Sequence, residues 1–253
     1  MSSVDSASAP SFRRLLPEPC GDVDVAAAYA YPQTRHRPWL RANMVASADG
    51  AAWGPSGRTV ELSDRADRRM LVVLRGLADV VLAGAATARI EGYRPVRQRE
   101  IFAKLREGRA TTPPIAVVTR TLNIHPRLLA DAPEESRTIV VTTESAPAER
   151  RRAAAEHAEV VVAGEESVDP EALIAALGAR GLFRVLCEGG PHLLAELSAA
   201  GLVDELCLTV SPHLLGPAAS RIVSGDTPSH TQDLELSHVL EAQGSLFLRY
   251  TRH

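Results

Sequence analysis

Residues 182–216 read LFRVLCEGGPHLLAELSAAGLVDELCLTVSPHLLG, and this stretch decides the fold. Two short apolar runs, at 183–187 and 204–210, flank a Glu-Gly-Gly turn and a helical pattern over 191–199. A strand, a helix and a strand in this order predict two parallel strands joined by a crossover helix. Glycine lets a ligand approach the backbone closely, and a helix N-terminus presents unpaired N–H groups, so the pair 189–190 can hold a phosphate. The alternative is that the two glycines only make the bend.

A second turn of this kind lies in VVLAGAATARIEGY, residues 80–93. Gly84 ends a short apolar run, small Ala85 follows, and the Thr87 hydroxyl can cap a helix or bond a phosphate oxygen. The segment is not the dinucleotide fingerprint Gly-x-Gly-x-x-Gly, because alanine and arginine stand at its second and third glycine positions. The sequence contains no Gly-Lys-Ser/Thr phosphate loop either. The alternative is an N-capped helix that simply follows a strand.

The composition is that of an ordinary globular protein. The 253 residues suffice for one large domain or two small ones, and 45% of them are hydrophobic. A net charge of −3 argues against a broad nucleic-acid-binding surface. Cys20, Cys187 and Cys207 are scattered, so we expect no disulfide framework and a cytoplasmic location. No apolar stretch approaches membrane-spanning length, and MSSVDSASAPSF predicts a disordered tail instead of a signal peptide.

Strand and helix patterns alternate along the chain. Apolar runs that predict strands occupy 40–47, 79–83, 114–120, 137–143, 159–164, 183–187 and 204–210. Helical patterns occupy 64–75, 101–108, 147–157, 170–178 and 191–199. For the helix at 64–75, Ser63 is the predicted N-cap, and Gly76 is expected just past the C-terminal end.

The C-terminal residues predict an antiparallel hairpin around Gln243-Gly244. With the alternating units, this gives an α/β fold with a mostly parallel sheet of about nine strands and helices on both faces. We expect one domain over 38–253 and a partly disordered tail over 1–37. The apolar strand 245–252 is expected at an exposed edge, and such an edge favours pairing with a second copy in a homodimer. The alternative is that another strand of the same chain covers it.

Five motifs follow one another in an order that resembles a known family. They are Ser47-Ala48-Asp49-Gly50, Leu74-Arg75 with Ala78-Asp79, Gly84-x-x-Thr87, Glu188-Gly189-Gly190 and Leu202-Val203-Asp204-Glu205-Leu206. Together, over 38–252, they resemble the reductase domain of bacterial riboflavin biosynthesis, which shares the dihydrofolate reductase fold. The resemblance is closest to the stand-alone actinobacterial members, which lack the zinc deaminase domain, and the sequence has no His/Cys zinc set of that type. It implies a three-layer α/β/α, dihydrofolate reductase-like fold without a metal site.

The resemblance also implies a reaction and a cofactor. The family reduces 5-amino-6-(5-phosphoribosylamino)uracil with NADPH, so that the ribosyl group becomes ribityl. By position, one side of the NADPH diphosphate would contact Gly84, Ala85 and Thr87, and the other side Gly189 and Gly190. Thr119 and Arg120 end the strand where the family holds the adenosine ribose phosphate. Arg120 would then bind the 2′-phosphate and favour NADPH over NADH, unless it is only a solvated arginine at a strand end.

On the substrate side, Asp49 is the candidate catalytic carboxylate, which would orient the substrate or relay a proton; the alternative is a turn aspartate before glycine. Ser47, in the same motif, is a candidate substrate contact. Glu188 ends an apolar strand, where a buried charge needs a partner such as a substrate amine or hydroxyl. Asn43 can read a pyrimidine or pteridine edge with its amide, or can be a satisfied core amide.

One segment departs from the family pattern. Where the family usually has Asp-Asn-Pro and then an arginine, this chain has EGYRPVR at 91–97. Glu91 can replace the aspartate, and Arg94 or Arg97 would supply the phosphate contact. Two alternatives therefore stay open. The first is an NADPH reductase of the same fold that acts on dihydrofolate or another pteridine or pyrimidine. The second is a nucleotide-binding protein without catalytic activity.

Overall fold

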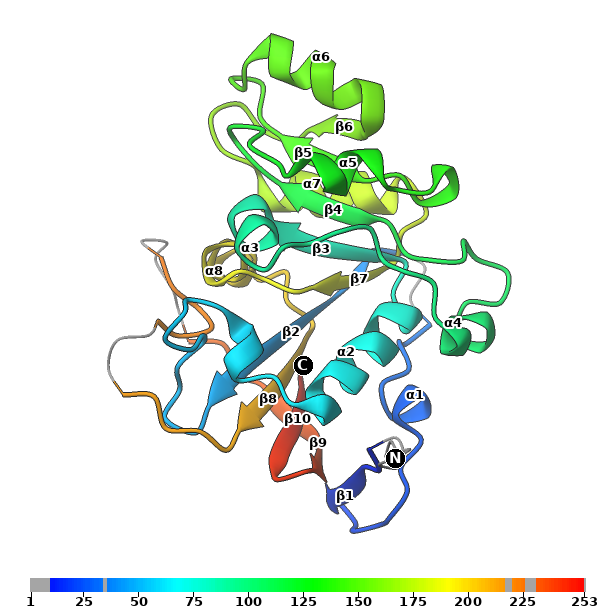
Figure 1. The fold of residues 1–253 in the computed structure, drawn as a ribbon, viewed down its shortest axis with the longest axis vertical. Helices are drawn as coiled ribbons and strands as arrows, with labels where there is room; N and C mark the ends of the chain where they lie inside the picture. The colour runs from blue at the N-terminus through cyan, green and yellow to red at the C-terminus, as the bar shows by residue number, and fades with distance from the viewer. Residues whose placement is uncertain (1–9, 34–35, 217–219, 226–230, 253) are drawn as a thin grey trace, which may run out of the picture.

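The computed structural model describes residues 10–33, 36–216, 220–225 and 231–252, and these form one sheet of ten strands with helices on both faces (Figure 1). The strands are β1 (Arg13–Leu16), β2 (Trp39–Ser47), β3 (Val80–Gly84), β4 (Ile115–Val118), β5 (Ile139–Thr142), β6 (Glu159–Val162), β7 (Arg184–Cys187), β8 (Glu205–Ser211), β9 (Glu235–Ala242) and β10 (Ser245–Thr251). The α-helices are α1 (Val25–Ala28), α2 (Arg65–Leu77), α3 (Ala85–Ile90), α4 (Glu100–Leu105), α5 (Pro126–Ala130), α6 (Ala148–His157), α7 (Pro170–Gly178) and α8 (Pro191–Ala199). Two 3₁₀ turns are η1 (Thr59–Glu61) and η2 (Glu134–Ser136).

The strand order is β1-β9-β10-β8-β2-β7-β3-β4-β5-β6. Strands β2 to β8 run parallel to one another, and β1, β9 and β10 add an antiparallel end. The turn between β9 and β10 is formed by Gln243 and Gly244, both with positive φ. The mostly parallel α/β sheet with an antiparallel C-terminal hairpin is therefore confirmed.

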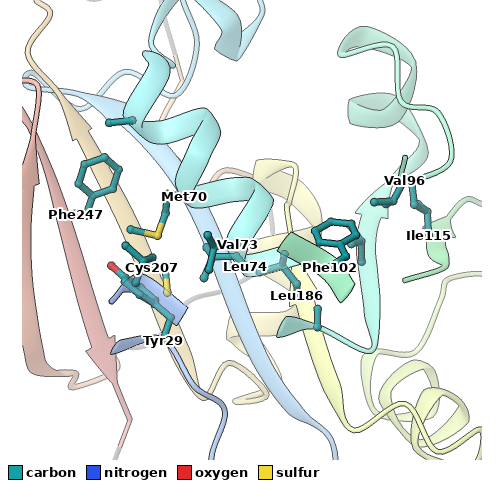
Figure 2. Close-up of a cluster of buried hydrophobic side chains, with 14 of the residues drawn as sticks. Tyr29, Met70, Val73, Leu74, Val96, Phe102, Ile115, Leu186, Cys207 and Phe247 are labelled. Carbon is teal, nitrogen blue, oxygen red and sulfur yellow. The ribbon is translucent and has the colours of Figure 1, made fainter. Parts of the chain in front are cut away.

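Alternating side chains of the strands pack into two cores on opposite faces of the sheet. One core holds α1, α2 and α4 against residues such as Val81, Leu186 and Cys207, and Figure 2 shows α2 lying across the strands there. The other core holds α7 and α8 against residues that include Val80 and Cys187. This confirms the predicted three-layer α/β/α arrangement.

Helix α2 begins and ends differently from the prediction. Its N-cap is Asp64, not Ser63, because the Asp64 carboxylate accepts a hydrogen bond of 2.7 Å from Asp67 N. Gly76 lies inside the helix, which continues to Leu77. The last carbonyls of α2 are bound by two arginines from beyond α4: Arg109 donates to Leu77 O at 3.0 Å, and Arg106 donates to Ala78 O. These donors stabilise the helix end without a glycine.

The packed part of the chain starts on the N-terminal side of the domain boundary expected at residue 38. Strand β1 pairs antiparallel with β9, and Phe12 and Tyr29 are buried in the core of α1 and α2. The Phe12 ring meets Phe247 of β10 edge-on, with ring centroids 5.2 Å apart. Residues 1–9 of the expected tail lie outside the described residues.

The expectation that 245–252 forms an exposed edge is wrong. Strand β10 lies inside the sheet, paired with β8 on one side and β9 on the other. Strand β1 covers β9, so the edges of the described sheet are β1 and β6. In the described ranges, no helix has the length and apolar character needed to cross a membrane.

Candidate active site

Four neighbouring parallel strands, β2, β7, β3 and β4, have their carboxyl ends at the same end of the sheet, and a residue predicted from the sequence stands at or directly after each of them. β2 ends at Ser47 and β3 at Gly84, while Thr119 follows β4 and Glu188 follows β7. The chain runs outward from β3 to β6 and then returns, because β7 lies between β2 and β3. Ligands of open α/β sheets bind at such a switch point, beyond the carboxyl ends of the strands.

The two glycine turns lie against each other at this end of the sheet, where α3 and α8 begin (Figure 1). Gly84 N donates to Gly189 O at 2.8 Å, and the peptide bond between Gly189 and Gly190 is cis. A Cβ atom at Gly190 would lie 2.3 Å from Thr87 Oγ1, and Gly189 has a φ of +82°. The packing of the turn itself thus requires both glycines. It also brings together four predicted cofactor residues: Gly84, Thr87, Gly189 and Gly190.

The contact between the two glycine turns is called here the glycine seam. A pocket of about 350 Å³ opens beside it and is called the glycine pocket. Four predicted cofactor residues line it: Gly84, Ala85, Thr119 and Arg120. Sequence reasoning missed further lining residues, among them Arg89, Thr121, Ser167, His192 and Glu196.

Three arginines lie at the loop 119–123, which follows β4 at the glycine pocket. Arg89 Nη1 donates to Asn123 O at 2.6 Å, and Arg150 Nη1 donates to Thr121 O at 2.9 Å. Arg120 is exposed, and within the described part of the chain its side chain makes no ion pair or hydrogen bond. The loop is fixed from inside, since Leu122 N donates to Thr119 Oγ1 at 3.0 Å. A glycine seam next to several cations fits the phosphates of a dinucleotide.

A second pocket, of about 380 Å³, lies beside α2 and is called here the arginine pocket. Its lining includes both predicted residues of the departing segment, Glu91 and Arg94, together with Thr59, Arg75, Tyr93, Arg97 and Arg99. Glu91 also holds the loop before α2, because its carboxylate accepts from Thr59 N at 2.8 Å and lies 3.7 Å from Arg58 Nε. The excess of arginine favours an anionic ligand here.

Glu188 is buried, with 9% of its surface exposed, and its partners belong to the protein itself. Arg75 binds both carboxylate oxygens, with Nε 2.7 Å from Oε1 and Nη2 2.6 Å from Oε2. The Tyr93 hydroxyl donates to Oε2. The buried charge of Glu188 therefore already has its partners within the protein, because α2 supplies the cation, and a substrate group is not needed to neutralise it. The pairing could not be read from the sequence, where Arg75 and Glu188 are 113 residues apart.

Asp49 lies exposed in the loop after β2 and ties that loop to the one after β8. Its carboxylate accepts from Ser47 Oγ, from Leu215 N at 3.1 Å and from Gly216 N at 2.8 Å. The Ser47 hydrogen bond first, and then the Gly216 N–H, lower the pKa of Asp49 below its ordinary value. Asp49 is thus ionised at neutral pH, so it is an acceptor and not a resting proton donor. Ser47 is buried and accepts from Ala51 N at 2.9 Å, so its hydroxyl serves the same loop.

Asn43 lies on the face of the sheet that α2 covers. Its register partner on the adjacent strand β8 is Cys207, which belongs to the α2 core. The residues on either side of Asn43, Ala42 and Met44, belong to the opposite core. Asn43 is partly exposed, and among the described residues its amide has no hydrogen-bond partner. The alternative of a satisfied core amide is therefore not supported, and the amide is free to meet a ligand.

Asp67, in the first turn of α2, is a buried carboxyl group that sequence reasoning did not single out. It accepts hydrogen bonds from Ser63 Oγ at 2.5 Å and from Thr209 Oγ1 at 2.7 Å. Burial raises its pKa above the ordinary value for aspartate. Only the fold brings Thr209 of β8 to this position.

Comparison with known families decides the relationship. The model described as the RibD C-terminal domain matches residues 38–246. The chain belongs to this family. Its members are pyrimidine reductases of riboflavin biosynthesis, which are oxidoreductases. The family expected from the five motifs is therefore confirmed.

Individual relatives agree with this assignment. The chain is 31% identical to 2,5-diamino-6-ribosylamino-4(3H)-pyrimidinone 5′-phosphate reductase of Archaeoglobus fulgidus over 71% of this chain and 83% of the relative. It is 29% identical to the enzyme of the same name from Methanothermobacter thermautotrophicus, over 85% and 98%. Among solved structures, a pyrimidine reductase-like protein of Corynebacterium diphtheriae has a TM-score of 0.80 and 29% identity, over 91% and 99% of the two chains.

Proposed function

We propose that this protein catalyses the NADPH-dependent reduction of the ribosyl group of a ribosylaminopyrimidine 5′-phosphate to the ribityl group. The observation that carries the proposal is the junction of the two pockets. Gly84 lines the glycine pocket and is bonded to Gly189, while the neighbouring Glu188 is held by Arg75 and Tyr93 of the arginine pocket. A cofactor in one pocket and an anionic substrate in the other would therefore meet at residues 188–189.

The glycine pocket is the proposed NADPH site. Bound NADPH would supply the hydride, and the protein supplies position and charge. Gly84, Ala85 and Thr87 on one side, and Gly189 and Gly190 on the other, would lie along the diphosphate. Arg120, with Thr119 beneath it, would meet the 2′-phosphate, supported by the two arginines that brace the loop.

The arginine pocket is the proposed site of the substrate phosphate. Arg94 and Arg97 are exposed on its lining and form no ion pair among the described residues. Guanidinium groups bind phosphate oxygens in pairs, so either arginine suits this task. Asn43, with its free amide, would read the pyrimidine edge, and Glu188 would accept from a ribosyl hydroxyl. Asp49, already ionised, would orient the loop over the site without donating a proton.

Two pyrimidine substrates are compatible with these two pockets. The sequence motifs favour 5-amino-6-(5-phosphoribosylamino)uracil, whereas the curated relatives are named for 2,5-diamino-6-ribosylamino-4(3H)-pyrimidinone 5′-phosphate. The two compounds differ at the pyrimidine ring and share the ribose phosphate, on which the proposal rests.

The test is an assay of NADPH oxidation with both pyrimidines and with dihydrofolate in parallel. We expect saturable turnover with at least one pyrimidine, and a ribityl product identified by mass spectrometry. Removing the 5′-phosphate from the substrate should raise KM more than it lowers kcat, because the arginine pocket would lose its ligand. Turnover of dihydrofolate alone would reject the proposal in favour of the pteridine alternative. NADPH binding without turnover of any substrate would favour the non-catalytic alternative.

A further inference from the structure

The side chains of Arg75, Tyr93 and Glu188 form a small cluster at the arginine pocket, called here the Glu188 cluster. Tyr93 stands in the segment where the chain departs from the family pattern. Its hydroxyl donates to Glu188 Oε2, and its ring lies beneath the Arg75 guanidinium, 5.4 Å from the ring centroid. Tyr93 thus contacts both members of the ion pair, one through its hydroxyl and the other through its ring.

The hydroxyl of Tyr93 can serve Glu188 only as a donor. Burial, and next the adjacent Glu188 charge, raise the pKa of Tyr93 well above its ordinary value, so the phenol stays protonated. Arg75 approaches the same carboxylate as a two-pronged donor. Arg75 of α2 and Tyr93 of the segment after α3 therefore together fix the plane of the carboxylate. A carboxylate has about four lone-pair positions, so one remains for a ligand hydroxyl.

The position of the cluster makes this orientation relevant to a reaction. Arg75 and Tyr93 line the arginine pocket, whereas Glu188 directly precedes the glycine pair that is bonded to Gly84 of the glycine pocket. A change in the Glu188 carboxylate plane would move its free lone pair with respect to both pockets. A misplacement of a positioning group by about 1 Å can cost roughly a hundredfold in rate.

We propose that Tyr93 is a positioning residue, which fixes the Glu188 carboxylate so that it accepts from a hydroxyl group of the ribosyl substrate; this inference rests on the proposed function. Tyr93 itself makes no contact with the reacting atoms. It acts through Glu188. Tyr93 belongs to the segment 91–97, in which this chain departs from the Asp-Asn-Pro pattern of the family.

The experiment is a double-mutant cycle with Tyr93→Phe and Glu188→Gln. Tyr93→Phe removes only the hydroxyl and keeps the ring beneath Arg75. We expect kcat/KM for the ribosylaminopyrimidine phosphate to fall about tenfold, as for loss of one hydrogen bond to a charged group. Affinity for NADPH, measured by calorimetry, should stay unchanged. Tyr250→Phe in β10 is the matched control and should leave both quantities unchanged.

In the Glu188→Gln background, Tyr93→Phe should have no further effect, because the group on which it acts has been altered. Where Glu188→Gln turns over too slowly, the same cycle is measured in the Kd of the ribityl product. Equal losses from Tyr93→Phe in both backgrounds would mean a merely structural role and overturn the inference. Activity of Tyr93→Phe equal to that of the wild type would overturn it as well. A wild-type protein that reduces neither pyrimidine would instead reject the proposed function, and this inference with it.

Discussion

At the scale of single residues, Arg120 is the group on which the choice of cofactor rests. Its side chain is exposed at the glycine pocket, without an ion-pair partner among the described residues. We predict that NADPH binds more tightly than NADH and that Arg120→Ala lowers NADPH affinity roughly tenfold or more, with little change for NADH. Calorimetry with both cofactors measures this. The control is Arg184→Ala, at the amino end of β7 and away from the glycine pocket. This variant should bind both cofactors like the wild type. Equal affinity of the wild type for both cofactors would contradict the prediction.

The Asp49 carboxylate gives a second prediction, which concerns pH. Its pKa is lowered in the fold, so the tie to Leu215 and Gly216 is fully present above the unfolded aspartate pKa of about 3.9. It is lost as pH falls through the lower folded value. We expect Asp49→Asn to speed amide hydrogen exchange at Gly216 at neutral pH, while the wild type stays protected until strongly acidic pH. Exchange at a core amide such as Val185 serves as the reference. Unchanged protection of Gly216 in Asp49→Asn would show that the charge of the carboxylate does not hold the loop.

At the scale of elements, a buried ion cluster joins β2, β8 and β10 near the end of the sheet opposite the candidate site. Arg41 and Glu205 are fully buried, with Arg41 Nε 2.7 Å from Glu205 Oε1. Arg249 Nε lies 2.7 Å from the same oxygen, and the Arg41 guanidinium stacks on Tyr31 at 3.9 Å. The Asp204-Glu205 pair of the fifth sequence motif therefore serves the fold, since Asp204 in turn accepts from Leu40 N at 2.8 Å.

We predict that Glu205→Gln destabilises the protein by about 3–5 kcal/mol, because the fully buried Arg41 and the partly buried Arg249 lose their counter-charge. Denaturant unfolding measures the change. Glu241→Gln is the control: its ion pair with Arg13 is at the surface, so its loss should cost less than about 1 kcal/mol. Although burial opposes ionisation, Arg41 and Arg249 lower the pKa of Glu205 overall, so this stabilisation is present above the ordinary glutamate pKa and is lost on acidification. Similar costs for the two variants would mean that the cluster is worth no more than a surface pair.

At the scale of the whole molecule, the sequence predicted what local pattern encodes. Apolar runs and helical patterns, such as the one over 170–178, located the parallel strands and most helices, because each signal lies within one element. Strand β1 was missed since its four residues, RRLL, are ordered by pairing with β9 more than two hundred positions away. The place of β10 inside the sheet was missed for the same reason.

The candidate site shows the same division. The glycine turns and strand-end residues were found because strand ends of a parallel sheet share one edge. The partners of Glu188, and the bonds that hold Asp49, come from residues far along the chain. No local pattern encodes such long-range pairs, so their chemistry became visible only when the fold brought them together.

The last prediction is a homodimer, and its basis is narrower than the sequence suggested. The argument from an exposed C-terminal edge fails, because β10 is paired on both sides. What remains is the prevalence of two-fold dimers among soluble oligomers. The outermost strands of the described sheet are β1 and β6, and each has only four residues. Short edge strands limit pairing between sheets, so we expect the dimer to form through side chains instead of a continuous sheet.

Light scattering coupled to size-exclusion chromatography decides the question at micromolar protein. The chain mass is 27.1 kDa, so a dimer has twice that mass and is easily resolved from a monomer. If the interface uses side chains, a charge introduced on the β6 edge by Val162→Lys, where the valine is 44% exposed, should leave the mass unchanged. Dissociation by that variant would show that the sheet edge pairs after all, and a monomeric wild type would reject the dimer outright.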